Sequence, residues 1–312
     1  MPNSSDRNKV ELKLEQIPSV SPSLAETLRI CPLQALLNRS RTLRQFTLGS
    51  PKAWLGTIYH EVLEKLWSNE RPGLEDDEWI EHLWDSAIER VRAEAAHHPL
   101  DWRFSENEDW PGYHLTRAMV RIRAREALPR QPRSRKVSAP SAEARTAQAP
   151  VREKTLHAMN GKLKGQPDVV SGNEIWDYKS GSVVEESPDG SKRAKEAYVR
   201  QLHLYGYLVH ENTGTCPSKG KLLPMQGSPV EIDLTPKSCK AEAEGAIGLL
   251  DALNAQIAKC ENIDQLAFAS ENSCYWCNHK THCESFWENV AEDWWEDRNS
   301  AAVSGSLSES AA

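Results

Sequence analysis

The chain has 312 residues, 39% of them hydrophobic, so it can bury a sizeable core as one large domain or two small ones. A mean hydropathy of −0.63, with no apolar run near the ~20 residues needed to cross a bilayer, excludes an integral membrane protein. The net charge of −7 argues mildly against a nucleic-acid binder. The polar residues 1–16 give no secretory signal, so we expect a cytoplasmic protein with no membrane partner.

The first part of the chain is predicted to be helical. The helix that starts near Ser21 is expected to kink or split at Pro32, because proline lacks an N–H and clashes with the preceding turn. Residues 1–20 are expected to be a flexible N-terminus. The predicted helices, which share apolar residues at helical spacing, span residues 21–38, 56–67, 78–96 and 113–128.

The second part of the chain is predicted to mix strands and helices. Residues 129–150 are rich in Pro, Ser, Ala and Arg and are interpreted as a flexible linker or insertion. Asn160-Gly161 and Ser171-Gly172-Asn173 are typical of tight turns between strands. The predicted strands span residues 151–159, 162–170, 174–179, 219–225 and 229–234. Predicted helices cover 194–210 and, beginning at Thr235-Pro236, about 236–260, so the pattern indicates an α/β fold with a small mixed sheet.

A basic stripe runs from Arg121 to Lys136, where seven Arg or Lys residues face only one acid, Glu126. Such a stripe can bind phosphates on an acidic protein, because the field of a charge acts over a Debye length of ~8 Å. By itself the stripe is better explained as a solvated charged segment. Its candidate nucleic-acid-binding residues are Arg121, Arg123 and Arg125.

Two carboxylates and a lysine form the main candidate for chemistry. Asp168 is followed, after a predicted tight turn, by Asp177 and Lys179. An antiparallel hairpin can bring the two carboxylates side by side, and Lys179 shares a strand face with Asp177. Mg²⁺ and Mn²⁺ prefer carboxylate oxygens and can polarise a phosphodiester, while the lysine can orient a water. A lone Asp-x-Lys is an ordinary surface pattern, so the interpretation depends on further residues.

Each of those further residues is a weak indicator of function by itself. His60 lies at the edge of the apolar face of its predicted helix, where a packed or solvent-facing histidine is more common than a ligand. Gln201 and Tyr205, four residues apart, share a helix face. The informative feature is their order along the chain. The ordered set is Gly56 with His60, Gly165 with Asp168, residues 177–181 (Asp-Tyr-Lys-Ser-Gly), and Gln201 with Tyr205.

This order resembles the RecB-like branch of the PD-(D/E)xK nuclease superfamily, over residues 21–287. The resemblance implies a restriction-endonuclease-like core. It also implies that His60, Asp168 and Asp177 bind a catalytic Mg²⁺ or Mn²⁺, together with the backbone carbonyl of Tyr178. Lys179 would be the catalytic lysine, with Asp168, Asp177, Gln201 and Tyr205 as the other catalytic-site residues. Asp177 in place of Glu is usual in this branch, whereas Pro167 occupies a position that more often holds a branched aliphatic residue.

Three cysteines near the end of the chain, Cys274, Cys277 and Cys283, have the spacing of thiolates that converge on one metal, and Cys31 is the candidate fourth ligand. The set resembles the iron–sulfur cysteines of AddB-type nuclease domains and CRISPR-associated exonucleases, which implies a [4Fe–4S] cluster tying the two ends of the domain together. A Cys3His zinc site using His279 or His282 remains open. A zinc knuckle fails because its fourth position is Trp287, and three unrelated buried cysteines are improbable at this spacing.

Composition and the resemblance together divide the chain into parts; the linker at 129–150 has no clear counterpart in the family. The expected parts are a flexible N-terminus (1–20), an N-terminal helical part with Cys31 and His60 (21–128), a linker (129–150), a nuclease core (151–260), a C-terminal cysteine-cluster segment acting as an iron–sulfur staple (261–298) and a disordered tail (299–312).

The function expected from these observations is metal-dependent cleavage of DNA, as an exonuclease on single strands or duplex ends, in repair, recombination or phage or CRISPR-type defence. The chain has no G-x-x-x-x-G-K-[ST] loop, so any ATP-driven unwinding would come from a helicase or other defence or repair partner. An alternative is an inactive nucleic-acid-binding or scaffold subunit of such a complex. A small redox iron–sulfur protein ranks last, because it leaves the carboxylates and lysine unexplained.

Overall fold

The computed structural model describes residues 15–66, 73–104, 106–128 and 154–291. The predicted linker at 129–150, the tail at 299–312 and the first 14 residues of the predicted flexible N-terminus lie outside these ranges. The chain forms two compact units. Of the described residues, the smaller unit combines 15–20, 24–40 and 248–291, and the larger combines 21–23 with those between 41 and 247.

The smaller unit brings segments together from both ends of the chain. The predicted first helix is split as expected, into α1 (Pro22–Ile30) and α2 (Pro32–Leu37). Cys31 between them is extended, and Pro32 takes the first helical position, where its missing N–H costs nothing. Near the other end, short helical segments follow one another at Ile263–Leu266, α9 (Glu271–Tyr275), Lys280–His282 and α10 (Glu284–Asn289).

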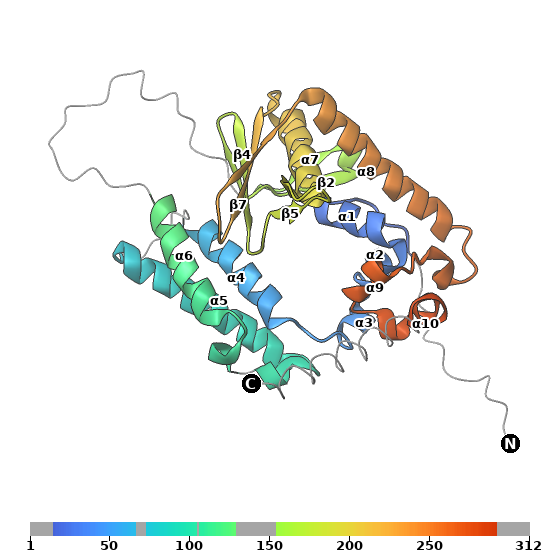
Figure 1. Cartoon of the computed structure of the whole chain (residues 1–312), viewed down its shortest axis with the longest axis horizontal. Coiled ribbons are helices and arrows are strands. Elements are labelled where there is room, and N and C mark those ends of the chain that lie inside the picture. Colours follow the sequence, from blue (N-terminus) through green and yellow to red (C-terminus); the bar gives the residue numbers. More distant parts are fainter. Residues whose placement is uncertain (1–14, 67–72, 105, 129–153, 292–312) are drawn as a thin grey trace. The chain divides into compact units, whose positions relative to one another are not determined.

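The larger unit contains a layer of three packed helices, α4 (Pro51–Lys65), α5 (Asp76–His97) and α6 (Tyr113–Ala127), which lie against one another (Figure 1). The helix predicted at 56–67 begins earlier than expected. Ser50 accepts a hydrogen bond from the Ala53 amide, and Pro51 follows it, so the cap and the proline together start α4. A single turn, α3 (Arg41–Arg44), precedes α4, and short 3₁₀ turns at Asp101–Phe104 and Asn107–Asp109 precede α6.

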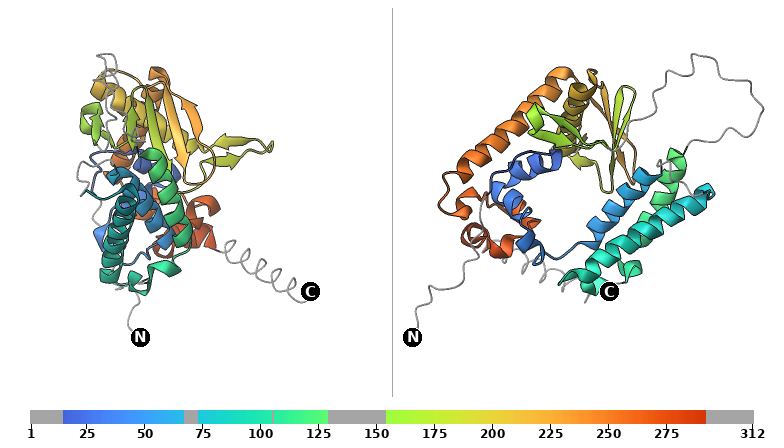
Figure 2. Two further views of the ribbon diagram at one scale, coloured as in Figure 1. Left: turned by 90° about the vertical axis from the view of Figure 1, so that its left-hand side faces the viewer. Right: turned by 180° about the vertical axis from the view of Figure 1, so that it is seen from behind.

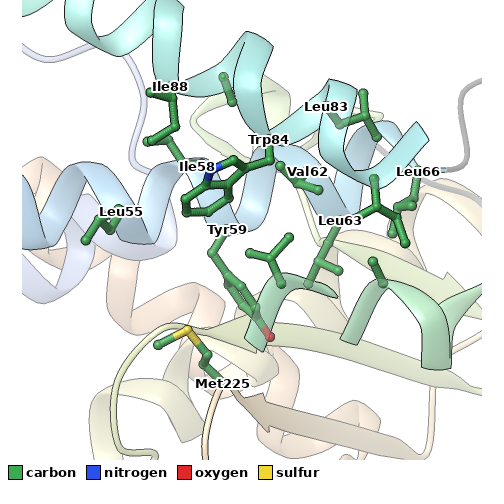
Figure 3. Close-up of a cluster of buried hydrophobic side chains, with 14 of the residues drawn as sticks. Leu55, Ile58, Tyr59, Val62, Leu63, Leu66, Leu83, Trp84, Ile88 and Met225 are labelled. Carbon is green, nitrogen blue, oxygen red and sulfur yellow. The ribbon is translucent and has the colours of Figure 1, made fainter. Parts of the chain in front are cut away.

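A cluster of buried side chains joins these helices to the sheet. Trp84 and Ile58 are almost completely buried where α5 crosses α4. Figure 3 shows the Tyr59 side chain reaching from α4 toward the sheet, where Met225 lies. Burial of side chains of this size stabilises a fold by about 1.5–3 kcal/mol each, so this cluster holds α4 and its polar residues in place.

The central sheet has four strands in the order β3-β4-β7-β8. Its strands are β3 (Val169–Ser171), β4 (Glu174–Lys179), β7 (Lys219–Pro224) and β8 (Val230–Asp233). The predicted turn after Ser171 is confirmed, because β3 and β4 pair antiparallel with Ser171 opposite Glu174. The β4–β7 pair is parallel, whereas β7–β8 is antiparallel, so the sheet is mixed as predicted.

The prediction of one continuous strand over residues 162–170 is wrong. The structure divides it into β2 (Leu163–Gly165), which pairs with β1 (Leu156–Ala158) in a separate two-stranded sheet, and β3 of the main sheet. Pro167 lies at the break, because proline has no N–H to donate to a strand ladder. Asp168 therefore precedes a strand rather than ending one.

The two faces of β4 serve different layers. Tyr178 belongs to the cluster shared with α4, α5 and α6, and Trp176 packs against it. Ile175, Asp177 and Lys179 point to the opposite face, because side chains alternate along a strand. Helix α7 (Glu196–Thr213) contacts both β4 and β7. A Cβ added at Gly220 would lie 2.8 Å from Leu202 of α7, so this glycine permits close packing of helix and sheet.

Two further elements are a two-stranded hairpin and a long helix that begins in the larger unit and ends in the smaller. The hairpin of β5 (Val184–Glu186) and β6 (Lys192–Ala194) was not predicted; it extends away from the main sheet (Figure 2). Helix α8 (Pro236–Ile257) begins as predicted, with the Thr235 hydroxyl accepting a hydrogen bond from the Ser238 amide. None of the helices in the described ranges has the length and apolar character of a membrane span.

Candidate active site

The predicted carboxylates meet at the start of β3 and the end of β4. The register places Val169 opposite Trp176, which sets Asp168 beside Asp177 one step further along the hairpin. The Oδ2 atom of Asp168 accepts a hydrogen bond of 2.7 Å from the Tyr178 amide, and it lies 3.6 Å from Nδ1 of His60 on α4. The structure thus brings together the histidine and both carboxylates that the sequence pattern singled out.

Asp177 is the carboxylate of the site whose pKa is strongly perturbed. Its side chain is buried, with the whole residue only 2% exposed, and this burial raises the pKa of its carboxyl to about 6, against the opposing attraction of Lys179 and with a further rise from Asp168. The Lys179 ammonium lies 2.6 Å from Asp177 Oδ2. The two form an ion pair, yet no donor in the described part of the chain has the direction of a hydrogen bond to that oxygen. Asp177 is therefore a buried carboxylate with Lys179 as its cationic partner.

Lys179 is held by a relay of polar groups from α7. Its Nζ donates a hydrogen bond of 2.8 Å to Oε1 of Gln201, and Nε2 of Gln201 donates one of 3.0 Å to the Tyr205 hydroxyl. Burial, with the nearby charge of Asp177, raises the pKa of Tyr205, so its hydroxyl stays protonated. The predicted pairing of Gln201 and Tyr205 on one helix face thus orients the lysine.

Tyr198 is a further neighbour of the lysine that sequence reasoning missed. Its ring centroid lies 4.7 Å from the Nζ atom of Lys179 and 5.8 Å from that of Lys195. The first distance is typical of a cation–π contact. Tyr198, Gln201 and Tyr205 stand on α7 at spacings of three and four residues, so they share one face. That spacing was the signal that could have found Tyr198.

Two glycines allow the elements of the site to approach one another. A Cβ added at Gly56 of α4 would lie 2.8 Å from the Ser180 hydroxyl, directly after the Asp-Tyr-Lys segment. A Cβ at Gly165 would lie 2.8 Å from Leu208 and 3.1 Å from Tyr205. The glycines of the Gly-x-x-x-His and Gly-x-x-Asp patterns are therefore explained by close packing around the site.

The donor set suits a hard divalent cation. Carboxylates and an imidazole are ligands that Mn²⁺ and Mg²⁺ sites use, and the buried Asp177 oxygen lacks a hydrogen bond. Among the described residues, however, no three His, Cys, Asp or Glu side chains already converge closely enough to hold an ion. The set fits a metal by the chemistry of its donor groups and by the burial of Asp177.

The three candidate DNA-binding arginines are all paired within the protein. Arg121 forms an ion pair with Glu81. Arg125 donates two hydrogen bonds of 2.7 Å to the Asp77 carboxylate, and Arg123 binds Glu126 and the Pro224 carbonyl. Their roles in DNA binding stay a prediction, and a phosphate would have to compete with these internal partners. Lys136, where the stripe was predicted to end, lies outside the described residues.

The four predicted cluster cysteines lie together in the smaller unit. Cys31, Cys274, Cys277 and Cys283 all line one small cavity of about 20 Å³. Cys274 and Cys283 are buried, and the Phe268 amide donates to the Cys31 sulfur at 3.5 Å. Burial raises the pKa of the Cys277 and Cys283 thiols, and the neighbouring sulfurs raise it further. The four thiols line one cavity, but no three His, Cys, Asp or Glu side chains in the described part of the chain are close enough to hold a metal ion.

Of the two histidines considered for a zinc site, His279 lies closer to the cysteines. It lines the same cavity, is buried, and has its Nε2 atom 2.9 Å from Oδ1 of Asn38. His282 is not among the residues that line the cavity. Burial lowers the pKa of His279, which keeps the ring neutral.

Comparison with known proteins agrees with this geometry. The sequence model of the family described as the PD-(D/E)XK nuclease superfamily matches residues 19–284. No curated protein gives a sequence match. A solved structure from Eubacterium rectale, provisionally described as an exonuclease, is 12% identical and covers 78% of this chain and 83% of its own, with a TM-score of 0.46. Members of the matched superfamily are phosphodiester hydrolases that typically use Mg²⁺ or Mn²⁺. Since the family match covers most of the chain, the protein belongs to the PD-(D/E)XK nuclease superfamily.

Proposed function

We propose that this nuclease is a metal-dependent deoxyribonuclease that acts as an exonuclease on single strands or duplex ends. The observation that carries the proposal is the buried Asp177 carboxylate, which lies beside Asp168 and is paired with an ordered Lys179. Burying a carboxylate is costly unless cations compensate it, and Lys179 supplies one positive charge beside Asp177. Perturbed groups of this kind gather at functional sites.

His60, Asp168 and Asp177 would hold the metal, with the Tyr178 carbonyl as a further oxygen ligand. When bound, Mg²⁺ or Mn²⁺ supplies Lewis-acid polarisation of the phosphate and lowers the pKa of a bound water. The Tyr178 amide, which donates to Asp168, orients that carboxylate. The fixed Val169–Trp176 register keeps the two carboxylates at neighbouring positions of the hairpin.

Lys179 would place a positive charge beside the attacking water and the phosphate. The Asp177 carboxylate and the Gln201 carbonyl hold its ammonium from two sides. Because this arrangement is formed in advance by β4 and α7, little reorganisation is needed during the reaction. Gln201 and Tyr205 serve to hold the lysine, with Tyr205 remaining neutral at physiological pH.

The cysteine site is proposed to bind a [4Fe–4S] cluster that stabilises the smaller unit. This proposal rests on four thiols lining one cavity, drawn from the two ends of the chain. A zinc ion held by three of the cysteines and His279 is the competing assignment. Iron and acid-labile sulfide analysis of anaerobically purified protein, with zinc measured in the same sample, separates the two.

The proposed setting is cytoplasmic DNA repair, recombination or defence, with a helicase or similar protein supplying any unwinding. These features rest on the resemblance to RecB-like and CRISPR-associated nucleases rather than on a contact in the molecule. Co-purification from its native cell, with the recovered proteins tested for ATPase activity, would identify such a partner. Recovery of the nuclease alone would count against a stable complex.

The nuclease proposal is tested with end-labelled single-stranded and double-stranded DNA in Mn²⁺, Mg²⁺ or EDTA. Wild type should cleave DNA only with metal, and Lys179→Ala should abolish cleavage. Lys221→Ala is the matched control, because Lys221 lies on the adjacent strand β7 and pairs with Glu174 away from the carboxylate pair. Equal cleavage by wild type and Lys179→Ala would reject the assigned centre. Wild type that binds DNA but never cuts it would favour the alternative of an inactive binding subunit.

A further inference from the structure

A second cavity opens in the larger unit where the parallel strands end. Its volume is about 440 Å³, and it is walled by four segments of the chain: the start of α4, the start of α6, the residues after β4 and the β7–β8 loop. Ligands commonly bind outside the carboxyl ends of parallel strands in α/β sheets. This cavity is distinct from the carboxylate pair, because neither Asp168, Asp177 nor Lys179 lines it.

The cavity wall is nevertheless continuous with the candidate active site. Ser180 and Gly181 line it directly after Lys179. Across the sheet, the Met225 amide donates a hydrogen bond of 2.6 Å to the Lys179 carbonyl, and Met225 also lines the cavity. A ligand in this cavity is therefore held at a fixed position relative to the lysine.

The lining combines apolar walls with a single positively charged side chain. Leu55, Leu115, Val184 and Met225 supply apolar surface. Lys52 is the only charged residue among the lining residues, which include no Asp or Glu, although the whole chain has 45 acids against 38 Lys and Arg. A small anion with an apolar body matches this combination, because charge and shape would both be complementary.

The start of α6 adds to the same preference. Gly112 precedes this 15-residue helix, and no side chain caps its first turn. Gly112, Leu115 and Thr116 line the cavity, so the positive end of the helix dipole opens onto it. An exposed Lys52 on α4 stands at the same cavity, and no described carboxylate pairs with it.

We propose that this cavity binds the terminal nucleotide of a DNA strand, with the base against the apolar walls and a phosphate near Lys52. The volume accommodates one nucleotide but not a duplex, and it falls within the ~300–1,000 Å³ of ligand sites. The inference rests on the proposed nuclease function and gives it a substrate preference. The end must be unpaired, so single-stranded ends are degraded in preference to blunt duplex ends.

The first test measures binding without catalysis. Isothermal titration of the full-length protein in EDTA compares dAMP, deoxyadenosine and inorganic phosphate. We expect dAMP to bind roughly tenfold more tightly than either fragment, which is about 1.4 kcal/mol. Leu115→Trp should fill the cavity and abolish dAMP binding, and Lys52→Glu should reduce dAMP affinity to that of deoxyadenosine. Phosphate binding as tightly as dAMP, or no binding by wild type, would overturn the proposal.

Matched variants control for general damage. Ile122→Trp places the same bulk on α6 two turns further on. Ile122 is 47% exposed and Leu115 is 50% exposed, but only Leu115 of the two lines the cavity. Lys237→Glu makes the same charge reversal at an exposed position on α8. Both controls should bind dAMP as wild type does. If they lose binding together with the cavity variants, the effect is not local and the proposal is wrong.

The second test compares linear with covalently closed circular single-stranded DNA in Mn²⁺. Leu115→Trp should slow degradation of linear strands roughly tenfold relative to Ile122→Trp, while any cutting of closed circles is unchanged. Equal rates for Leu115→Trp and Ile122→Trp on linear strands would overturn the proposal. A protein that binds dAMP in a Leu115-dependent way but cuts no DNA would reject the nuclease function and leave the nucleotide site standing.

Discussion

Replacing Asp177 with Asn should make the fold more stable while abolishing cleavage. The carboxylate is buried, and its pKa in the folded protein is about 6 against an ordinary value of 3.8. A shift of this size corresponds to about 3 kcal/mol that the ionised form costs the folded state. That value already includes the attraction of Lys179. Removing the charge should therefore stabilise the folded state by about this amount, even though the ion pair is lost.

The raised pKa of Asp177 determines how the stability of the fold changes with pH. Because the folded pKa is raised, protonation of Asp177 favours the folded state at low pH, and this contribution is lost as pH rises through about 6. The neutral asparagine has no such loss. The variant should therefore exceed wild type by about 3 kcal/mol at pH 8 and by less than about 1 kcal/mol near pH 4.

Urea unfolding followed by circular dichroism in EDTA, at pH 4 and pH 8, measures this difference. A melting temperature raised by roughly 6–12 °C at pH 8 is the matching thermal result. Asp109→Asn is the control, because Asp109 is exposed and should show no difference at either pH. An Asp177→Asn variant less stable than wild type at pH 8, or equally shifted at both pH values, would refute the reasoning.

Three further outcomes follow from the same contacts. Gly165→Ala should lower the free energy of unfolding by about 1–3 kcal/mol, because its Cβ would lie 2.8 Å from Leu208. Gly181→Ala is the control, because a Cβ there would meet open space and should leave stability unchanged. Urea unfolding measures both variants, and equal losses of stability would contradict the packing explanation. Tyr198→Leu should lower kcat several-fold with KM little changed, because the aromatic ring near Lys179 is lost and a cation–π contact is worth about 0.5–2 kcal/mol. Tyr198→Phe keeps the ring and should retain the wild-type kcat. A kcat as low for Tyr198→Phe as for Tyr198→Leu would show that the ring does not matter. Cys274→Ser should lower bound iron and sulfide and the melting temperature, while Cys260→Ser, outside the cysteine cavity, should change neither; retention of full iron in Cys274→Ser would remove Cys274 from the ligand set.

Local sequence signals predicted much of the path around the candidate site. Ser171-Gly172-Asn173 predicted the β3–β4 turn, and Gly172 does adopt a positive φ of 58°, which glycine tolerates. Pro32 predicted the division between α1 and α2. These features depend on the backbone preferences of a few neighbouring residues, so they can be inferred from sequence alone.

Some local signals were present but were not used. Ser50-Pro51 is a helix start, yet the apolar spacing alone placed the beginning of α4 at residue 56. Pro167 between β2 and β3 divides one predicted strand into two sheets. Neither the β5–β6 hairpin nor Tyr198 was predicted, because the hairpin is polar and the tyrosine lies outside the Gln-x-x-x-Tyr pattern.

The sequence by itself determined the residue types of the site, their order and the turn that sets Asp168 beside Asp177, because short-range sterics and strand alternation decide those features. Only the tertiary structure decided that β4 pairs in parallel with β7, that α7 carries Gln201 to Lys179, and that Asp177 is buried. It also decided that the basic stripe's first arginines are paired with Glu81, Asp77 and Glu126. Burial, pKa and charge pairing depend on residues that are distant in sequence, and long-range packing alone brings them together.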